Sequence, residues 1–112
     1  MTSVRIVRVT SSSMEPTYCT GDLLVVINNL LFLTVRPNGA KVGDVCLFSA
    51  YKQVQGEFIK RVVRINHEDG LTYYYILGDN NLKSLDSRDF GSIPADLARG
   101  LVLGRLGQKH CR

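Results

Sequence analysis

Two side chains in this sequence, Ser13 and Lys60, together have what nucleophilic catalysis requires. A serine hydroxyl is a poor nucleophile until a neighbouring base removes its proton. A lysine amine can be that base only in its neutral form, and the pKa of lysine in water is about 10.4. Burial among apolar side chains disfavours the charged ammonium and lowers this pKa. A lysine on an apolar strand is therefore a candidate general base for the serine.

Lys60 lies in such an apolar run, residues 58–63. Side chains alternate between the two faces of a β-strand. Phe58, Lys60 and Val62 are therefore expected on one face, with Arg61 on the other. This pattern predicts that Lys60 has apolar neighbours while Arg61 points away from it.

Ser13 is the last of three consecutive serines, residues 11–13. If this stretch is extended, Ser11 and Ser13 project to the same side. The Ser13 hydroxyl could then attack a carbonyl carbon, while the Ser11 hydroxyl and the Ser13 backbone N–H stabilise the oxyanion. Loss of one such donor typically raises the barrier by about 2.7–4 kcal/mol. Pro16 would stiffen the turn that presents the nucleophile.

A third polar segment, residues 78–91, carries glycines and charged residues that a plain β domain does not need. Each of the three segments also has an ordinary structural explanation. Serine clusters are usually solvated loops, and a Lys-Arg pair on a strand is usually an edge or snorkelling pair. The Asp-Ser-Arg stretch alone could be a salt-bridged turn. Their combination is what favours a site.

The composition indicates one globular domain spanning residues 1–112. The net charge of +4 would suit an anionic partner. The basic residues are scattered singly or in pairs, however, without aromatic residues interleaved among them. This distribution argues against nucleic acid as a partner.

The cysteines and histidines suggest neither a metal site nor a disulfide framework. Cys19, Cys46 and Cys111 are widely spaced and odd in number, and the chain has no CxxC motif. His67 and His110 lie in a loop-like stretch and in the C-terminal tail, where we expect them to be solvated. The sequence therefore predicts no metal and no cofactor, and it offers no histidine base for Ser13.

The apolar runs predict a mainly-β single domain of coiled or barrel-like antiparallel sheets with one short helix. The helix is expected at residues 94–99, where a proline opens the segment and Gly100 ends it. The strands are expected at residues 4–10, 23–27, 30–35, 45–50, 57–65, 71–77 and 101–106. The most apolar stretch, residues 23–35, has 13 residues, which is short of the roughly 20 needed for a transmembrane helix.

Taken in order, these segments resemble the type I signal peptidase family of serine–lysine proteases. The resemblance covers nearly the whole chain, from Ser13 to the trailing residues 100–105. The matching motifs are Ser-Met-x-Pro-Thr at 13–17, Gly-Asp-Val at 43–45, Lys-Arg-Val at 60–62, and Gly-Asp-Asn…Ser-x-Asp-Ser-Arg-x-Phe-Gly at 78–91.

The resemblance implies a role for individual side chains. Ser13 corresponds to the nucleophile and Lys60 to the general base, and Ser11 corresponds to the residue whose hydroxyl helps to form the oxyanion hole. Ser84 corresponds to the serine that orients the lysine amine. The polar residues expected to support the site are Asp79, Asp86 and Arg88.

The resemblance also implies a substrate and a location. The family cleaves signal or targeting presequences after small residues of the Ala-x-Ala kind, at a membrane face. The compact layout is most similar to mitochondrial inner-membrane protease subunits and to the short maturation proteases of nickel superoxide dismutase. We expect the outer face of the plasma membrane or the mitochondrial inner membrane, with cytoplasm as the alternative for a chain without a span. The apolar residues 30–35 could provide peripheral membrane contact, and a membrane-anchored partner subunit could supply the rest.

Other functions remain open at this stage. A self-cleaving repressor-type domain uses the same serine–lysine chemistry, but only 12 residues precede Ser13, which leaves little room for a cleavage segment. A non-catalytic or partner-dependent subunit of a membrane processing protease is a second alternative. A β-barrel binding module is a third, and it would leave the four ordered motifs unexplained.

Overall fold

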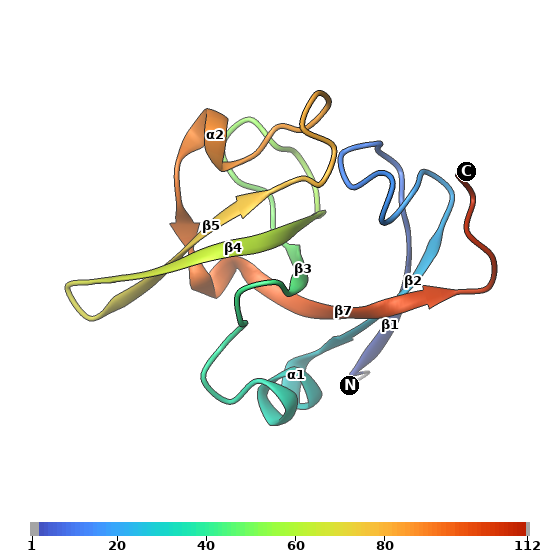
Figure 1. Cartoon of the computed structure of the whole chain (residues 1–112). Helices are drawn as coiled ribbons and strands as arrows, with labels where there is room; N and C mark the ends of the chain where they lie inside the picture. Colours follow the sequence, from blue (N-terminus) through green and yellow to red (C-terminus); the bar gives the residue numbers. More distant parts are fainter. Residues whose placement is uncertain (1–2, 112) are drawn as a thin grey trace.

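The computed structural model describes residues 3–111 and is mainly β, as the sequence predicts (Figure 1). One antiparallel sheet curls into a half-barrel, with its strands in the order β1-β2-β7-β3-β4-β5-β6. The strands are β1 (Val4–Arg8), β2 (Leu23–Asn28), β3 (Val45–Phe48), β4 (Phe58–Glu68), β5 (Leu71–Leu77), β6 (Ile93–Pro94) and β7 (Ala98–Leu106). The helices are α1 (Asn29–Val35), α2 (Ser87–Phe90) and the 3-10 turn η1 (Ala95–Leu97).

Two apolar clusters form the core. One surrounds Phe48, Val62 and Ile76, and the other surrounds Met14 and Leu24. Met14 is completely buried, and burial of such a side chain stabilises the fold by roughly 1.5–3 kcal/mol. The residue next to Ser13 is therefore anchored in the core, although the chain around it forms no strand or helix.

The strand predicted at residues 30–35 is wrong, because this stretch forms helix α1. A short apolar run cannot be assigned to helix or strand from periodicity alone. Leu31 and Phe32 pack against the core, whereas Leu30 and Leu33, three residues apart, are 72% and 61% exposed. No helix among residues 3–111 is long and apolar enough to cross a membrane.

The helix predicted at residues 94–99 is also wrong. Pro94 pairs with Tyr73 as part of β6, and a single 3-10 turn separates it from β7. Ala98 already pairs with Phe48. Strand pairing on both sides outweighs the local helical preference of these residues. The short helix that does form, α2, begins after Asp86 and was not predicted.

The structure also corrects the reading of the cysteines. Cys19 and Cys111 form a disulfide, with their Cα atoms 5.5 Å apart, and Cys46 is a buried free thiol. The two bonded cysteines are separated by 92 residues in the sequence, so their spacing carried no local signal. The disulfide joins the C-terminal tail to the segment that follows Ser13.

Candidate active site

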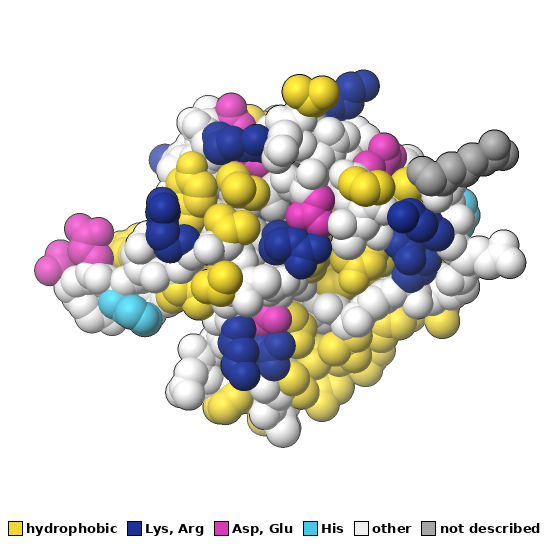
Figure 2. Space-filling model, in the orientation of Figure 1, with side chains coloured by type: hydrophobic (Ala, Val, Ile, Leu, Met, Phe, Trp, Pro, Cys, Tyr) yellow, Lys and Arg dark blue, Asp and Glu magenta, His cyan; other side chains and the backbone are white. Residues whose placement is uncertain are grey.

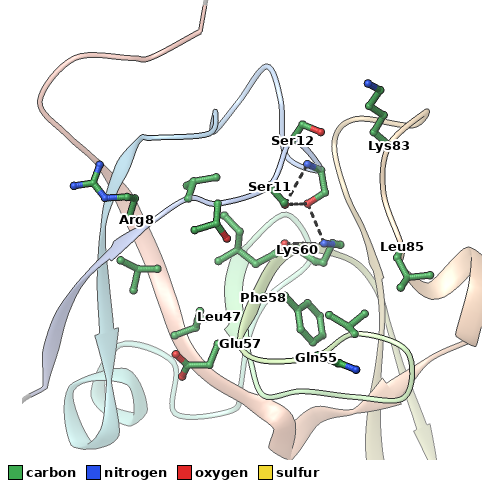
Figure 3. Close-up of a pocket in the computed structure, with 16 residues that line it drawn as sticks. Arg8, Ser11, Ser12, Leu47, Gln55, Glu57, Phe58, Lys60, Lys83 and Leu85 are labelled. Atoms are coloured by element: carbon green, nitrogen blue, oxygen red, sulfur yellow. Dashed lines mark hydrogen bonds between the residues drawn. The ribbon is translucent and has the colours of Figure 1, made fainter.

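Ser13 and Lys60 meet in the folded protein, and both are buried (Figure 3). Ser13 lies in the loop between β1 and β2, and Lys60 is on the buried face of β4. Lys60 Nζ lies 3.0 Å from Ser13 Oγ. The side chains are only 4% and 6% exposed, so water competes little for this contact. In its neutral form the amine could accept the proton of the hydroxyl at this distance.

Opposing effects act on the ionisation of Lys60, and burial is the largest of them. Burial lowers the pKa of Lys60, and the nearby carboxylate of Asp86 opposes that shift by raising it. Nζ also lies 3.2 Å from the backbone carbonyl oxygen of Ile59 and 5.4 Å from the centre of the Phe58 ring. A depressed lysine pKa is what a general base working near neutral pH requires.

Ser11 lies beside the Ser13 hydroxyl, although residues 11–13 form bends and a turn rather than the extended stretch that the sequence analysis assumed. Ser11 Oγ is 3.2 Å from Ser13 Oγ, and the Ser13 backbone N–H donates to Ser11 Oγ at 3.4 Å. A hydroxyl donor and a backbone N–H are thus adjacent to the nucleophilic oxygen. In this structure the N–H bonds to Ser11 Oγ itself, so the use of both groups as oxyanion donors stays a prediction.

Two residues that the sequence analysis did not single out hold the loop between β1 and β2, here called the serine loop, in place. The Asn80 backbone N–H donates to the Ser13 carbonyl oxygen at 2.9 Å, and its side-chain amide donates to the Ser12 carbonyl oxygen at 3.0 Å. Gly78 packs so closely that a Cβ atom there would lie 2.5 Å from the Ser13 carbonyl oxygen. The signal for both was their place in the Gly-Asp-Asn motif.

Asp79 connects the serine loop to β4. Its carboxylate accepts two hydrogen bonds from Arg61, at 2.9 and 2.8 Å, and one from the Thr17 hydroxyl at 2.6 Å. The Arg61 hydrogen bonds are the main cause of the lowered pKa of Asp79, with a smaller contribution from Thr17. Because Arg61 follows Lys60 and Thr17 follows the serines, this ion pair fixes the two catalytic candidates relative to each other.

Asp86 is a fully buried carboxylate behind the site. It accepts hydrogen bonds from the Arg88 guanidinium, the Ser84 hydroxyl and the Gly78 backbone N–H. Burial alone would raise the pKa of Asp86, but these donors outweigh it and lower the pKa to about 2. Asp86 also caps helix α2. It therefore stays ionised and organises the whole 78–91 segment.

Ser84 lies in this network rather than on the lysine. Its hydroxyl donates to Asp86 at 2.6 Å. Among residues 3–111, the hydrogen bonds of Lys60 Nζ go to Ser13 Oγ and the Ile59 carbonyl oxygen. Direct orientation of the lysine amine by Ser84 therefore stays a prediction from the resemblance.

Ser13 is one of the residues that line a groove with a volume of about 530 Å³; Figure 3 shows the side chains around it. Its walls come from β1, from the loop before β4 and from the 78–91 segment. The ion pair between Arg5 and Glu57, with both distances 2.9 Å, ties β1 to that loop. The apolar side chains that line the groove are Val7, Val9, Leu47, Val54, Phe58, Ile59 and Leu85.

The histidines lie elsewhere. His67 Nδ1 is 3.1 Å from the Thr72 hydroxyl in the β4–β5 hairpin. His110 is exposed, as expected, and it also contacts the buried Asp22 through both its backbone N–H and Nδ1. Within residues 3–111, no group of three or more His, Cys, Asp or Glu side chains could hold a metal ion.

Comparison with known families agrees with this arrangement. The family model for signal peptidase, peptidase S26, matches residues 1–66. The chain belongs to the signal peptidase family S26. A search of curated proteins found no match. The matched part of this S26 chain contains both Ser13 and Lys60, whereas the 78–91 segment lies outside it.

Membership in the S26 family supports a signal-peptidase-like serine protease at the level of the family. The 78–91 segment is linked to the site by its contacts with the serine loop. Asn80 donates a hydrogen bond to the Ser12 carbonyl oxygen, and Gly78 packs against Ser13. Asp79 accepts hydrogen bonds from both Thr17 and Arg61.

Proposed function

We propose that this S26 family member is a serine endopeptidase in which Ser13 is the nucleophile and Lys60 is the general base. The observation that carries the proposal is the buried 3.0 Å contact between Lys60 Nζ and Ser13 Oγ. An ordinary lysine is protonated near neutral pH and cannot accept the serine proton, but here burial lowers the pKa of the lysine.

The proposed reaction follows from the positions of these atoms. The neutral Lys60 amine removes the Ser13 proton as Oγ attacks the carbonyl carbon of the scissile peptide bond. The Ser11 hydroxyl and the Ser13 backbone N–H stabilise the oxyanion. The Lys60 ammonium then protonates the leaving amine, and an ester forms on Ser13. Water activated by Lys60 hydrolyses this ester and restores the serine.

The groove supports a substrate bound in an extended conformation with small or apolar side chains near the cut. Its lining is apolar on the side of Leu47, Phe58 and Ile59, and Ser13 lies at its edge. We propose that the substrate is a precursor protein whose signal or targeting presequence, or short N-terminal extension, is removed after a small residue. The residues that select this side chain are expected among those apolar groove walls.

Cleavage of a fluorogenic peptide containing Ala-x-Ala tests the assignment. We expect wild type to cleave it, and Ser13→Ala and Lys60→Ala to reduce kcat by at least about 100-fold, the usual contribution of a positioned general base. Cleavage that survives in Ser13→Ala would refute the nucleophile. Cleavage absent from wild type, with and without detergent, would instead favour a non-catalytic or partner-dependent subunit.

We further propose peripheral contact with a membrane, through α1 and the neighbouring outer strands. Figure 2 shows hydrophobic side chains gathered where β1, β2 and β7 lie. The most exposed residues of α1 are Leu30 and Leu33, whereas Leu31 and Phe32 pack inward. The other exposed apolar side chains of β1 and β7 are Val4, Ile6, Leu103 and Leu106.

Vesicle co-sedimentation tests the membrane contact. The Leu30→Asp/Leu33→Asp variant is expected to lose binding while keeping the fold, because both side chains are exposed. Lack of binding by wild type to neutral and anionic vesicles would refute direct contact, and a membrane-anchored partner subunit would then be the remaining route. A disulfide persists in oxidising compartments, so Cys19–Cys111 supports the outer face of a membrane over the cytoplasm.

A further inference from the structure

The C-terminal tail is fastened to the segment that carries the nucleophile at more than one point. The disulfide joins Cys111 of the tail to Cys19, which lies six residues after Ser13. His110 donates its backbone N–H to Asp22 at 2.7 Å, and its ring Nδ1 lies 3.0 Å from the same carboxylate oxygen. We call residues 107–111 with these contacts the C-terminal latch.

The buried carboxylate of Asp22 is the common anchor of the latch. Besides His110, it accepts hydrogen bonds from the Cys19 backbone N–H at 2.8 Å and from Arg105 Nε at 2.9 Å. Arg105 also donates to the Thr17 carbonyl oxygen. Asp22 is completely buried, and a buried carboxylate that loses its donors is strongly destabilised. The C-terminal end of the 14–19 segment therefore depends on partners outside it.

From Cys19 the chain of contacts leads back to the nucleophile. The Tyr18 backbone N–H donates to the Met14 carbonyl oxygen at 2.9 Å, which closes a turn directly after Ser13. Thr17, inside this turn, donates to Asp79 at 2.6 Å. Displacement of Cys19 would therefore move the turn that presents Ser13 to Lys60.

We propose that the Cys19–Cys111 disulfide is a redox-controlled positioning element of the active site, which holds the Ser13 segment in its productive place when oxidised and releases it when reduced. The catalytic consequence rests on the proposed function, whereas the structural one does not. Cys19 and Cys111 touch no reacting atom; they act through the 14–19 turn.

The redox step needs a dithiol reductant. Cys111 is partly exposed and Cys19 is fully buried, so the attacking thiolate reaches the Cys111 sulfur. The bond between the two cysteines breaks, Cys19 leaves as a thiolate and takes up a proton, and Cys111 forms a mixed disulfide. The second thiol of the reductant then attacks this mixed disulfide and frees Cys111 as a thiol. The two cysteines gain two electrons and two protons, and the dithiol becomes a cyclic disulfide.

Two measurements test the latch on the full chain: peptide cleavage and amide hydrogen exchange, each with oxidised wild type, dithiothreitol-reduced wild type and Cys111→Ser. We expect loss of the disulfide to lower kcat at least about ten-fold with a smaller change in KM, since a misplacement of about 1 Å can cost about 100-fold. The rising limb of the pH–kcat profile should move to higher pH. A loosened Ser13 segment admits water to Lys60, and hydration brings the pKa of the lysine back toward its ordinary value. Dithiothreitol should have no further effect on Cys111→Ser, which is the matched control.

Exchange separates a local latch from general support of the fold. We expect faster exchange at the Tyr18 and Asn80 amides, which bond to Met14 and Ser13, while the β4 and β5 amides keep their protection. Unchanged kcat, or a uniform rise in exchange across β4 and β5, would overturn the proposal. If oxidised wild type cleaves no peptide, the proposed function fails, and exchange at Tyr18 and Asn80 alone decides whether the latch exists.

Discussion

Replacement of Gly78 by alanine is expected to displace Ser13, although Ser13 itself is not substituted. The added Cβ would lie 2.2 Å from the Ser84 hydroxyl oxygen, which can rotate, and 2.5 Å from the Ser13 carbonyl oxygen, which is backbone. A close C···O contact is about 3.3–3.6 Å. The backbone at position 78 and the Ser13 carbonyl oxygen must therefore separate by roughly 1 Å. Because Ser13 is part of the serine loop that Asn80 holds, this separation moves Ser13 relative to Lys60.

The expected size of the effect follows from this displacement. A shift of about 1 Å in a reacting group costs about 100-fold in rate, so kcat of Gly78→Ala should fall by about that factor with little change in KM. Steady-state cleavage of the Ala-x-Ala peptide measures it, and thermal unfolding followed by circular dichroism shows whether the variant is folded. Overpacking of this kind also costs about 1–3 kcal/mol of stability.

Gly104 offers a matched control on β7. A Cβ added there has no neighbouring atom within 4 Å, and its backbone does not have a positive φ. We expect Gly104→Ala to keep kcat within about two-fold, as for an unstrained surface substitution. A folded Gly78→Ala variant with wild-type kcat would show that the serine loop can yield without cost, and would refute this reasoning.

Two further predictions concern ionisation. Burial lowers the pKa of Lys60, so kcat should rise with pH as the amine loses its proton, with a midpoint below the ordinary lysine pKa of 10.5. The Lys60→Arg variant stays charged and should be inactive throughout the kcat–pH profile. Activity in that variant would exclude a lysine base. The pKa of Asp86 is lowered to about 2 from 3.8, so its ionisation stabilises the fold above about pH 4 and this stability is lost as pH falls towards 2. Asp86→Asn should lower the free energy of unfolding by about 3 kcal/mol near neutral pH. It should also flatten the curve of melting temperature against pH between about pH 4 and pH 2. An unchanged curve would mean that another carboxylate causes the loss of stability in acid.

The sequence was most informative where residue type alone limits the chemistry. The histidines of this chain lie outside the motifs, so a lysine in an apolar strand was the candidate base for Ser13. Alternation along β4 also correctly placed Arg61 away from Lys60. The mainly-β fold also followed from its β-branched runs. Local pattern failed at residues 30–35, because an apolar run of this length is compatible with either helix or strand.

Contacts between distant segments were invisible in the sequence. Asn80 reaches the serine loop across 67 residues of chain, and Cys19 meets Cys111 only because β2 and β7 pair in the sheet. The sequence by itself determined the class of fold, the nucleophile candidate and its base candidate, since these depend on residue type and local periodicity. Only the tertiary structure decided their 3.0 Å separation, the burial that lowers the pKa of the lysine and the latch on the serine segment. Each of these depends on which distant residues the curled sheet brings together.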